Sequence, residues 1–419
     1  MRNKPVEPTM ATLPGTALAL IHAGQAPTRS ALTARLGVTR ATVGAITSEL
    51  RDLRLIQVTA AAGGGQQGRP SHRLLPDPDG PVALAAELYT DGFAVALVGL
   101  GATIIARSSR DLPVSADPEQ ALAPVTEAAA ALLRQSGRPC VGAGIALQAA
   151  VTEPAGATVG ALYFGWPDGA KMRDIFAAQL AEHGVAGPNG EPLPRWIRPE
   201  APGASACRAV NDVNAVALAE HRHGAGRDAA HLLVVAATRR GVGSALVLRG
   251  ALYTGSTGLA MEAGHVSIDP QGRPCPCGSR GCLNVETDAG RFLDAAGRVP
   301  DPGSDPLATA IALLRAGYGT DPRIREAAGT LVDRLGLGLA SLVNVVNPDR
   351  VLLGGLHKHL LLAAPEQLRD AVAARSPWGR GAAVPIVGCA LDDDAALIGA
   401  AELAWQPILD NPALLRPLR

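Results

Sequence analysis

The residues best suited to metal chemistry lie close together in the second half of the sequence. One imidazole and three thiols occur in a short glycine-rich segment, at His265, Cys275, Cys277 and Cys282. Gly278 and Gly281 allow the backbone to curl tightly, so that the three sulfur atoms can converge on one point. Three thiolates and an imidazole are a common tetrahedral ligand set for zinc, and they leave no open position for a catalytic water. We therefore expect a structural Zn²⁺ ion here.

The alternative interpretation is that these cysteines form disulfides or a redox pair. A disulfide between Cys275 and Cys277 would close a very small, strained ring. A chain of 419 residues with only six cysteines is also typical of a reducing compartment, where disulfides are rare. Both considerations favour the metal site.

A second group of polar residues follows a short apolar run. Residues 207–210 predict a buried strand, and Asn211 and Asp212 come at its carboxyl end, where a helix is expected to begin. In open α/β sheets, side chains at this place point into the crevice where ligands bind. The alternative is that the pair only caps the helix. The His-Arg-His group at residues 221–223 contains possible metal ligands, but we interpret it as solvated side chains near the negative end of the helix dipole.

The composition of the chain limits the class of protein to which it can belong. The hydrophobic content is 47%, so the chain can build two or three domains with sizeable cores. Its formal net charge is zero, but residues 1–75 hold nine basic and three acidic residues, a net charge of +6. The first residues do not have the basic-then-apolar pattern of a signal sequence, and the sequence has no run of about eighteen uncharged apolar residues. We expect a cytoplasmic protein without a membrane partner.

Residues 12–60 contain three short segments with helical periodicity. Apolar residues recur at helical spacing in three segments, which are separated by the break at Gly24–Pro27 and by Gly37. A short helix, a turn and a longer helix form a helix-turn-helix pattern, for which a plain helical bundle is the alternative. The third helix would present polar side chains to the base edges and phosphates of the major groove. These residues are Thr39, Arg40, Thr42 and Ser48, followed by Arg51 toward the phosphate backbone.

Two strand-like runs at residues 55–59 and 73–75 follow these helices. The intervening segment is rich in glycine, and its Pro70 keeps Arg69 on an extended backbone that suits a narrow minor groove. We interpret this segment as a wing that contacts DNA. An ordinary flexible linker is the alternative.

The remainder of the chain predicts an α/β body. Three strand-like runs between residues 82 and 108 precede a long helix from Pro118 and a strand at residues 141–147. Helices and strands then alternate to a final helix at residues 395–405. The predicted domains are a winged helix-turn-helix at 1–78, a first lobe at 79–205 joined by a C-terminal helix at about 393–410, and a second lobe with the zinc site at 206–392.

The metal segment resembles the signature of the ROK family, which comprises repressors, open reading frames of unknown function and sugar kinases. The resemblance covers Glu262, Gly264, His265 and the cysteines, whereas Asn284 stands where the family usually has Glu, and the nearest carboxylate is Glu286. It implies two stacked ribonuclease-H-like (actin-like ATPase) lobes. Residues 12–75 resemble the winged helix-turn-helix of ROK repressors, which ROK kinases lack.

The resemblance also implies a sugar site between the lobes. In the family, the Asn-Asp pair that matches Asn211 and Asp212 binds sugar hydroxyls, and the Asp is the catalytic base of the kinases. Glu262 and His265 would complete the site from across the crevice, with one ring nitrogen of His265 on zinc and the other free for a hydroxyl. Asn284 would offer a neutral amide in place of a carboxylate.

The phosphate-binding turns of the kinases are not preserved in this sequence. A Gly-Gly-Thr turn in the first hairpin is replaced by residues that include Tyr89 and Asp91, and a second glycine-rich turn now contains Arg239 and Arg240. We therefore expect that the protein is not an enzyme and that Asp212 is only the equivalent of a kinase base.

These features predict a transcriptional regulator, specifically a repressor. It would bind an operator in duplex DNA as a homodimer or homotetramer, because paired recognition helices read half-sites about one helical turn apart. A sugar or sugar phosphate between the lobes would be the effector. The alternatives are a ROK sugar kinase with a DNA-binding arm, and a ROK regulator that no longer senses sugar.

Overall fold

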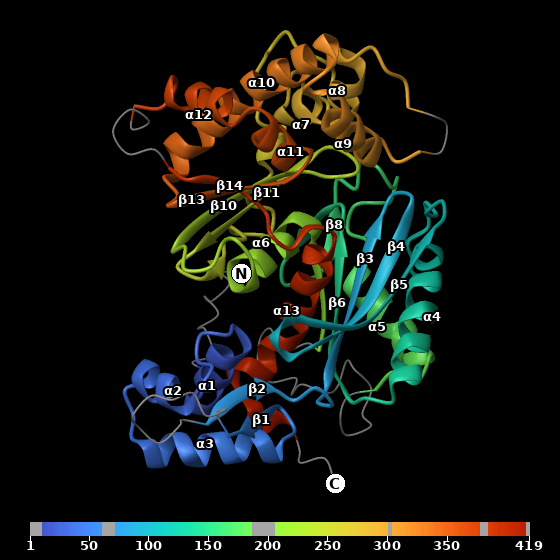
Figure 1. The fold of residues 1–419 in the computed structure, drawn as a ribbon. Coiled ribbons are helices and arrows are strands. Elements are labelled where there is room, and N and C mark those ends of the chain that lie inside the picture. The colour runs from blue at the N-terminus through green and yellow to red at the C-terminus, as the bar shows by residue number, and fades with distance from the viewer. Residues whose placement is uncertain (1–10, 61–71, 187–205, 301–303, 378–383, 416–419) are drawn as a thin grey trace.

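The structure is a computed structural model that describes residues 11–60, 72–186, 206–300, 304–377 and 384–415. Figure 1 shows three parts within these residues: a small helical module, a sheet in the middle, and a second sheet covered by helices. Each sheet has five strands. The α/β body predicted from the sequence is therefore present.

The N-terminal module contains three helices and a two-stranded sheet. The helices are α1 (Leu13–His22), α2 (Arg29–Leu36) and α3 (Arg40–Asp52), and the antiparallel strands are β1 (Ile56–Thr59) and β2 (Arg73–Pro76). Threonine side chains cap all three helices, at Thr12, Thr28 and Thr39. Gly37 ends α2 at a φ of 66°, a left-handed conformation that suits glycine. The helices and strands predicted for this module are present, whereas Arg69 lies outside the described residues.

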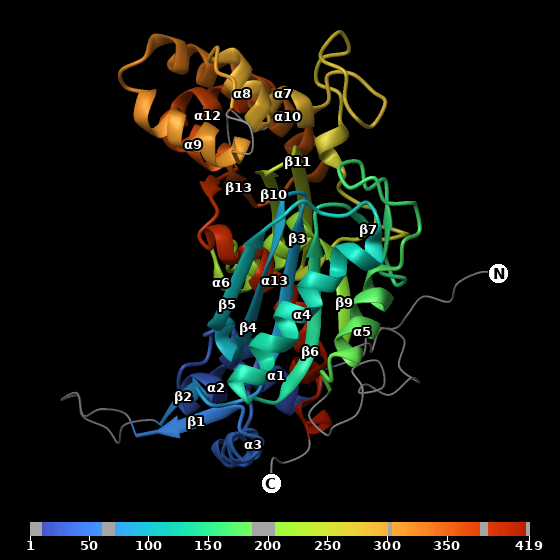
Figure 2. The same ribbon diagram turned by 90° about the vertical axis from the view of Figure 1, so that its right-hand side faces the viewer.

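The first sheet has the strand order β5-β4-β3-β6-β9. Its strands are β3 (Val82–Tyr89), β4 (Gly92–Gly99), β5 (Thr103–Asp111), β6 (Cys140–Leu147) and β9 (Cys207–Asn211). The first three are antiparallel, and β6 and β9 continue the sheet in parallel. Helices α4 (Pro118–Ser136) and α5 (Met172–Glu182) cover one face, and α13 (Ala395–Asp410) covers the other (Figures 1 and 2). A hairpin of β7 (Ala150–Thr152) and β8 (Ala157–Val159) follows β6.

The second sheet has the order β12-β11-β10-β13-β14. Its strands are β10 (His231–Ala237), β11 (Val242–Leu248), β12 (Ala251–Leu252), β13 (Arg350–Gly355) and β14 (Ile386–Gly388). Six helices lie on one face: α7 (Leu283–Thr287), α8 (Ala289–Ala295), α9 (Pro306–Gly317), α10 (Pro322–Val346), α11 (Leu356–Ala363) and α12 (Pro365–Ala373). Helix α6 (Asp212–His223) packs on the other face. Strand β10 serves both cores because successive side chains alternate: Leu233 and Val235 join the larger helical core, and Val234 contacts the side of α6.

Helix α10 is long and apolar enough, by length and composition alone, to cross a membrane. In this protein its apolar face lies in the core of the second sheet, where Leu331, Leu335 and Leu339 are buried. Arg334 on the same helix forms an ion pair with the buried Glu286. These contacts are those of a core helix.

Helix α13 joins the C-terminal end of the chain to the first sheet and to the N-terminal module. Trp405 is fully buried, and its indole N–H donates to the carbonyl oxygen of Val98 at 3.1 Å. The carbonyl oxygen of Asp410 accepts hydrogen bonds from the N–H and the hydroxyl of Thr12, at 2.9 and 3.0 Å. At Gly15, a side chain would overlap the backbone of Asp410, so glycine permits the close approach of α1.

The change from the first to the second sheet comes after Asn211. Strand β9 pairs with β6 and so belongs to the first sheet, although the predicted second lobe begins at residue 206. The C-terminal helix α13 packs on the first sheet. The domain limits at 78 and 392 stay predictions.

Candidate functional site

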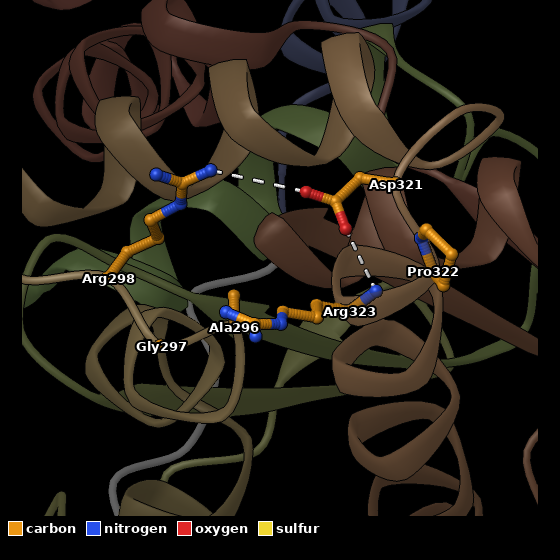
Figure 3. Close-up of a pocket in the computed structure, with 6 residues that line it drawn as sticks. All are labelled: Ala296, Gly297, Arg298, Asp321, Pro322 and Arg323. Carbon is orange, nitrogen blue, oxygen red and sulfur yellow. Dashed lines mark hydrogen bonds and ion pairs between the residues drawn. The ribbon is translucent and has the colours of Figure 1, made fainter.

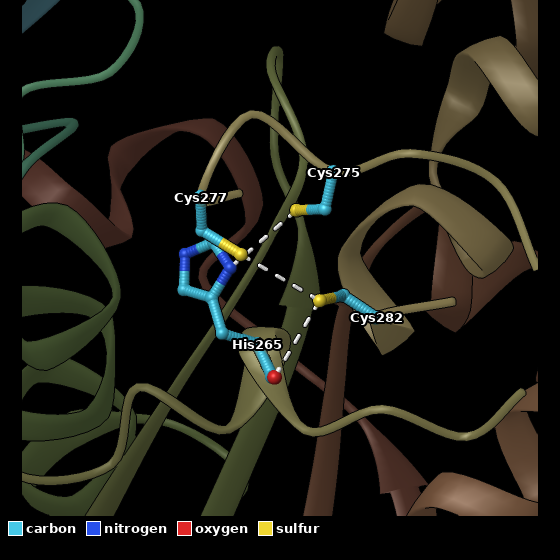
Figure 4. A group of neighbouring side chains, drawn as sticks. All are labelled: His265, Cys275, Cys277 and Cys282. Atoms are coloured by element: carbon cyan, nitrogen blue, oxygen red, sulfur yellow. Dashed lines mark hydrogen bonds between the residues drawn. The ribbon is translucent and has the colours of Figure 1, made fainter. Parts of the chain in front are cut away.

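The predicted metal ligands converge in the structure, as Figure 4 shows. The ligand atoms of His265, Cys275, Cys277 and Cys282 all lie within 4.8 Å of one another. The Nδ1 atom of His265 is 3.7 Å from Cys275 Sγ, and Cys277 Sγ is 3.7 Å from Cys282 Sγ. Tetrahedral zinc with bonds of about 2.3 Å would place two thiolates about 3.8 Å apart. Both the donor set and the spacing therefore fit a metal ion of this kind.

The backbone between His265 and Cys282, called the metal loop below, brings the thiols together. Gly278 and Gly281 have φ angles of 91° and 58°, which glycine adopts without strain. Gly281 also lies against the carbonyl oxygen of Asp269, where a side chain would overlap it. An isolated antiparallel bridge between Ser267 and Cys282 closes the loop. The sequence signal from the glycines thus corresponds to real turns.

Asn284 is buried beside the metal cluster, with 3% of its surface exposed. Its Oδ1 accepts a hydrogen bond from the N–H of Val242 at 2.6 Å, and its Nδ2 donates to the hydroxyl of Tyr163 at 3.1 Å. Nδ2 also lies 3.8 Å from Cys275 Sγ. A ligand would have to compete with these partners for the amide. Tyr163 was not predicted, because a single tyrosine in a turn-rich stretch has no spacing that marks it.

Glu286 does not replace the missing carboxylate at position 284. Its side chain is fully buried and accepts a hydrogen bond from the N–H of Arg273 at 2.9 Å. It also forms ion pairs with Arg334 and, at 3.8 Å, with Arg291. Because its charge is already balanced by two arginines, Glu286 connects α7 to α10 and is not available to a ligand.

Asn211 and Asp212 lie where β9 ends and α6 begins, as the sequence predicted. Asn211 caps the helix, since its Oδ1 accepts from the N–H groups of Val213 and Asn214 at 3.0 and 3.1 Å. Its Nδ2 donates to Ala149 at 3.2 Å. The capping role that was considered as the alternative is therefore real for Asn211. Asp212 Oδ1 accepts from the Val213 N–H at 2.9 Å.

Asp212 belongs to a group of three carboxyls with raised pKa values. Burial, followed by the negative charge of Glu262, raises the pKa of Asp212 to about 7. Burial, followed by the charge of Asp212, raises the pKa of Glu87 to about 7. Burial also raises the pKa of Glu262, although this side chain keeps contact with solvent. Near neutral pH, Asp212 and Glu87 can both donate and accept hydrogen bonds, which suits a neutral polyhydroxy ligand better than an anion.

Tyr89 and Arg239, the two main departures from the kinase turns, contact each other. The guanidinium of Arg239 lies 4.2 Å from the centre of the Tyr89 ring. It also forms ion pairs with Asp91 at 3.4 Å and with Asp305 at 2.9 Å. Asp91 lies in the turn between β3 and β4, and Asp305 caps α9, so Arg239 connects the two sheets. Its positive charge is already neutralised by protein carboxylates.

The predicted DNA contacts lie along α3, apart from Arg69. Those within the described residues are Thr39, Arg40, Thr42, Ser48 and Arg51. Thr39 is exposed and accepts from the N–H of Thr42 at 3.1 Å, so its hydroxyl caps the helix. Arg40 is exposed, Ser48 is half-buried, and Arg51 pairs with its exposed neighbour Asp52 at 3.0 Å. The start of α3 is thus open to an external partner.

The interpretation of residues 221–223 as solvated side chains is wrong. His223 Nε2 lies 2.8 Å from Oε1 of Glu402, and Arg222 donates to Oε2 of the same carboxylate at 2.5 Å. His221 Nε2 lies 3.0 Å from the carbonyl oxygen of Ala229. Helix α13 covers this end of α6, and Glu402 itself is 1% exposed. Nothing in the local sequence indicates a partner about 180 residues away.

A separate depression of about 430 Å³ lies on the second lobe, near the ends of α8 and α10 (Figure 3). It is lined by Ala296, Gly297, Arg298, Asp321, Pro322 and Arg323. Asp321 caps α10 by accepting from the N–H of Arg323 at 2.9 Å, and Arg298 approaches it at 4.0 Å. These polar groups serve the helix end. The residues predicted for the functional site are not part of its lining.

Comparison with known proteins identifies relatives of the body. Residues 201–406 match the sequence model of the ROK family. A glucokinase from Thermotoga maritima is 32% identical over 210 residues, which are 47% of this chain and 65% of the glucokinase. A putative xylose repressor from Caldicellulosiruptor sp. is 30% identical over 211 residues, which are 48% of this chain and 53% of the repressor. The chain therefore spans between about half and two thirds of these curated relatives.

Two solved structures share the fold. A ROK family transcriptional regulator, a homologue of the E. coli MLC protein, has a TM-score of 0.70 at 22% identity and covers 96% of this chain and 97% of its own. A ROK family glucokinase from Streptomyces griseus, in complex with glucose and AMPPNP, has a TM-score of 0.61 at 21% identity. The match covers 78% of this chain and 99% of the glucokinase.

Proposed function

Because this chain carries a ROK family domain in residues 201–406, we propose that it is a DNA-binding transcriptional regulator that acts as a repressor and responds to a sugar. The observation that carries the proposal is the helical module in front of the first sheet, in which α3 begins with the exposed Thr39 and Arg40. The extent of the structural matches supports it, because the regulator aligns along 96% of the chain and the glucokinase along 78%.

The winged helix-turn-helix binds duplex DNA through α3. The start of this helix enters the major groove, where Arg40, Thr39 and Thr42 reach base edges or phosphates, while Ser48 and Arg51 lie further along. The net charge of +6 over residues 1–75 supports attraction to phosphates. Arg69 in the wing adds a minor-groove contact. A homodimer or homotetramer presents two such helices to a palindromic operator.

The effector is a sugar, and its site is formed by Asn211, Asp212, Glu262 and His265. The carboxyls of Asp212 and Glu262 form hydrogen bonds with hydroxyl groups of the sugar. Nδ1 of His265 faces Cys275, so its other ring nitrogen can serve the sugar. Asn284 shapes the site through its hydrogen bonds with the Val242 N–H and the Tyr163 hydroxyl.

The metal is a structural Zn²⁺ ion held by His265, Cys275, Cys277 and Cys282. When bound, it neutralises the thiolates and fixes the loop that precedes α7. The cysteine-poor composition and the free thiols of this chain support a reducing, cytoplasmic location.

Phosphoryl transfer is not part of the proposed function. Arg239 stacks on Tyr89 and is neutralised by Asp91 and Asp305, so the turns that bind ATP phosphates in kinases instead contact each other. The rival function is a sugar kinase with a DNA-binding arm, which Asp212 and the 32% identity to a glucokinase favour. A coupled assay with ATP and a hexose panel decides between them, because turnover of about 1 per second or more would establish the kinase.

DNA binding is tested with fragments of the source genome. Wild-type protein should select a small set of fragments, and fluorescence anisotropy should show an affinity that falls steeply with salt. Arg40→Ala should weaken binding and lower the salt slope by about 1. Addition of D-glucose or D-xylose should change the affinity if sugar is the effector. Failure to bind any fragment at low salt would overturn the proposed function.

A further inference from the structure

A buried carboxylate joins three helices that are distant in the sequence. Glu402 of α13 is 1% exposed, and its Oε1 lies 2.7 Å from His22 Nε2 and 2.8 Å from His223 Nε2. Its Oε2 accepts from Arg222 at 2.5 Å. His22 is the last residue of α1 in the N-terminal module, whereas Arg222 and His223 end α6. We call these four side chains the Glu402 junction.

The hydrogen bonds define the protonation of His22. Its Nδ1 accepts from the N–H of Gly101 at 2.9 Å, so the ring proton lies on Nε2 and is donated to Glu402. A metal ion bound by His22, His223 and Glu402 would need the lone pair on that Nε2. It would also lie close to the guanidinium of Arg222. The geometry therefore describes a hydrogen-bonded ion pair and not a second metal site.

Further contacts hold the same surfaces together. Arg222 also donates to Gln406, whose amide donates to Asp410 at 2.7 Å. The backbone of Asp410 receives both hydrogen bonds of Thr12, the cap of α1. Arg227, in the segment after α6, donates to the carbonyl oxygen of Ala23 directly after α1. The end of α6 thus contacts the N-terminal module through several polar groups.

The other end of α6 lies in the proposed sugar site. Asn211 caps the helix and Asp212 is its first residue. Twelve helical residues span about 18 Å, so one rigid element reaches from the sugar site to the Glu402 junction. Its central part is buried, with Val213 and Ala217 packed against the second sheet. A displacement of its start therefore moves its end as well.

We propose that α6 and the Glu402 junction transmit sugar binding at Asp212 to the position of the DNA-binding module. This inference rests on the proposed function of sensing a sugar. A buried carboxylate that is ion-paired with Arg222 and hydrogen-bonded to two histidines tolerates little change in geometry, so a shift of Arg222 and His223 carries Glu402 and His22 with it. Glu402, Arg222 and His22 act here as positioning residues, because they lie outside the residues proposed to contact DNA or sugar.

The test compares Glu402→Gln with a matched control on α6 in the full-length protein. Glu220 is also a fully buried carboxylate, but it accepts hydrogen bonds from the backbone N–H groups of Ala225, Ala390 and Leu391. Affinity for a selected genomic fragment is measured with and without the panel sugar that shifts the melting temperature of the wild type most. Glu402→Gln should keep the melting shift caused by sugar, but its DNA affinity should change less than twofold on sugar addition.

The control Glu220→Gln should keep the full sugar-dependent change of the wild type, expected to be about fivefold to 150-fold for such coupling. Arg222→Gln is the milder variant in case Glu402→Gln does not fold, and Arg222→Lys should restore part of the coupling. An unchanged sugar response in Glu402→Gln and Arg222→Gln overturns this inference alone. If no sugar shifts the melting temperature of the wild type, the sugar-sensing function itself fails.

Discussion

Removal of one thiolate from the metal cluster should show how far the second lobe depends on zinc. Cys277→Ser replaces a sulfur that lies 3.7 Å from Cys282 Sγ by a hydroxyl that stays protonated at neutral pH. A neutral oxygen is a poor ligand for zinc compared with a thiolate, so we expect affinity to fall about a thousandfold or more. For a metal that binds the folded state alone, that loss corresponds to about 4 kcal/mol of stabilisation.

The structure indicates where this free energy is lost. The metal loop leads into α7, and Asn284 on α7 holds the start of β11 through Val242 and contacts Tyr163. Loosening the loop should therefore loosen the turn between β10 and β11. For a lobe of about 200 residues, 4 kcal/mol corresponds to a fall in melting temperature of about 8 to 16 °C.

The assay combines metal analysis with calorimetry. Wild-type protein should contain about one zinc per chain after gel filtration, and Cys277→Ser should contain much less and melt at lower temperature. Cys140→Ser is the control, because Cys140 is buried in β6 and its thiol donates to Gly142 at 3.3 Å, which a hydroxyl can also do. It should retain its zinc. A zinc-free wild type, or a Cys277→Ser protein with full zinc content, would refute the reasoning.

Three further predictions concern the sugar site, its pH dependence and the contact between the lobes. Asp212→Asn should abolish the sugar-induced stabilisation, about 2.7 kcal/mol at a hundredfold excess over Kd. It should not lower the ligand-free melting temperature, because Asn can still accept from the Val213 N–H. Burial raises the folded-state pKa of Asp212 and Glu87 to about 7. The stability that these two protonated carboxyls contribute is therefore present at low pH and is lost as pH rises toward 7. Sugar affinity should rise over the same range, and melting curves from pH 5 to 8 with and without sugar measure both the stability and the affinity. Arg239→Gln should lower the free energy of unfolding by about 1 to 2 kcal/mol in denaturant titrations, since its cation–π contact and its partly exposed ion pairs are each worth about 1 kcal/mol or less. Arg240 is exposed, so Arg240→Gln should change the free energy of unfolding little.

Features with a local physical cause could be predicted from the sequence. Thr28 and Thr39 cap α2 and α3 because a β-hydroxyl reaches the N–H groups of the next turn, and Gly37 ends α2 in a left-handed conformation. The convergence of the predicted metal ligands has the same kind of local cause, because three of the four lie within eight residues. Tyr89 and Arg239 were each recognised as departures from a phosphate-binding turn, but their mutual contact was not predicted.

Features that depend on tertiary packing were missed. His22 and Glu402 are separated by 380 residues, and neither has a local partner that would indicate a buried pair. Residues 221–223 have the composition of an exposed helix end, and only α13 packing across them changes their environment. Asn284 was predicted to contact the ligand, and the three protein groups around its amide could not be read from the sequence. In each case the deciding partner comes from another element of the fold.

The Glu402 junction is better explained by a need for defined geometry than by a need for stability. A buried ion pair adds little net stability relative to an apolar contact, but loss of one partner costs about 3 to 5 kcal/mol. Coupling between two sites typically requires only 1 to 3 kcal/mol. The penalty for disturbing Glu402 therefore exceeds what a ligand must transmit, so α1 should follow α6 and not separate from it. If the proposed sugar site and DNA-binding module lie at opposite ends of α6, a rigid contact of this kind is what the proposed regulation requires.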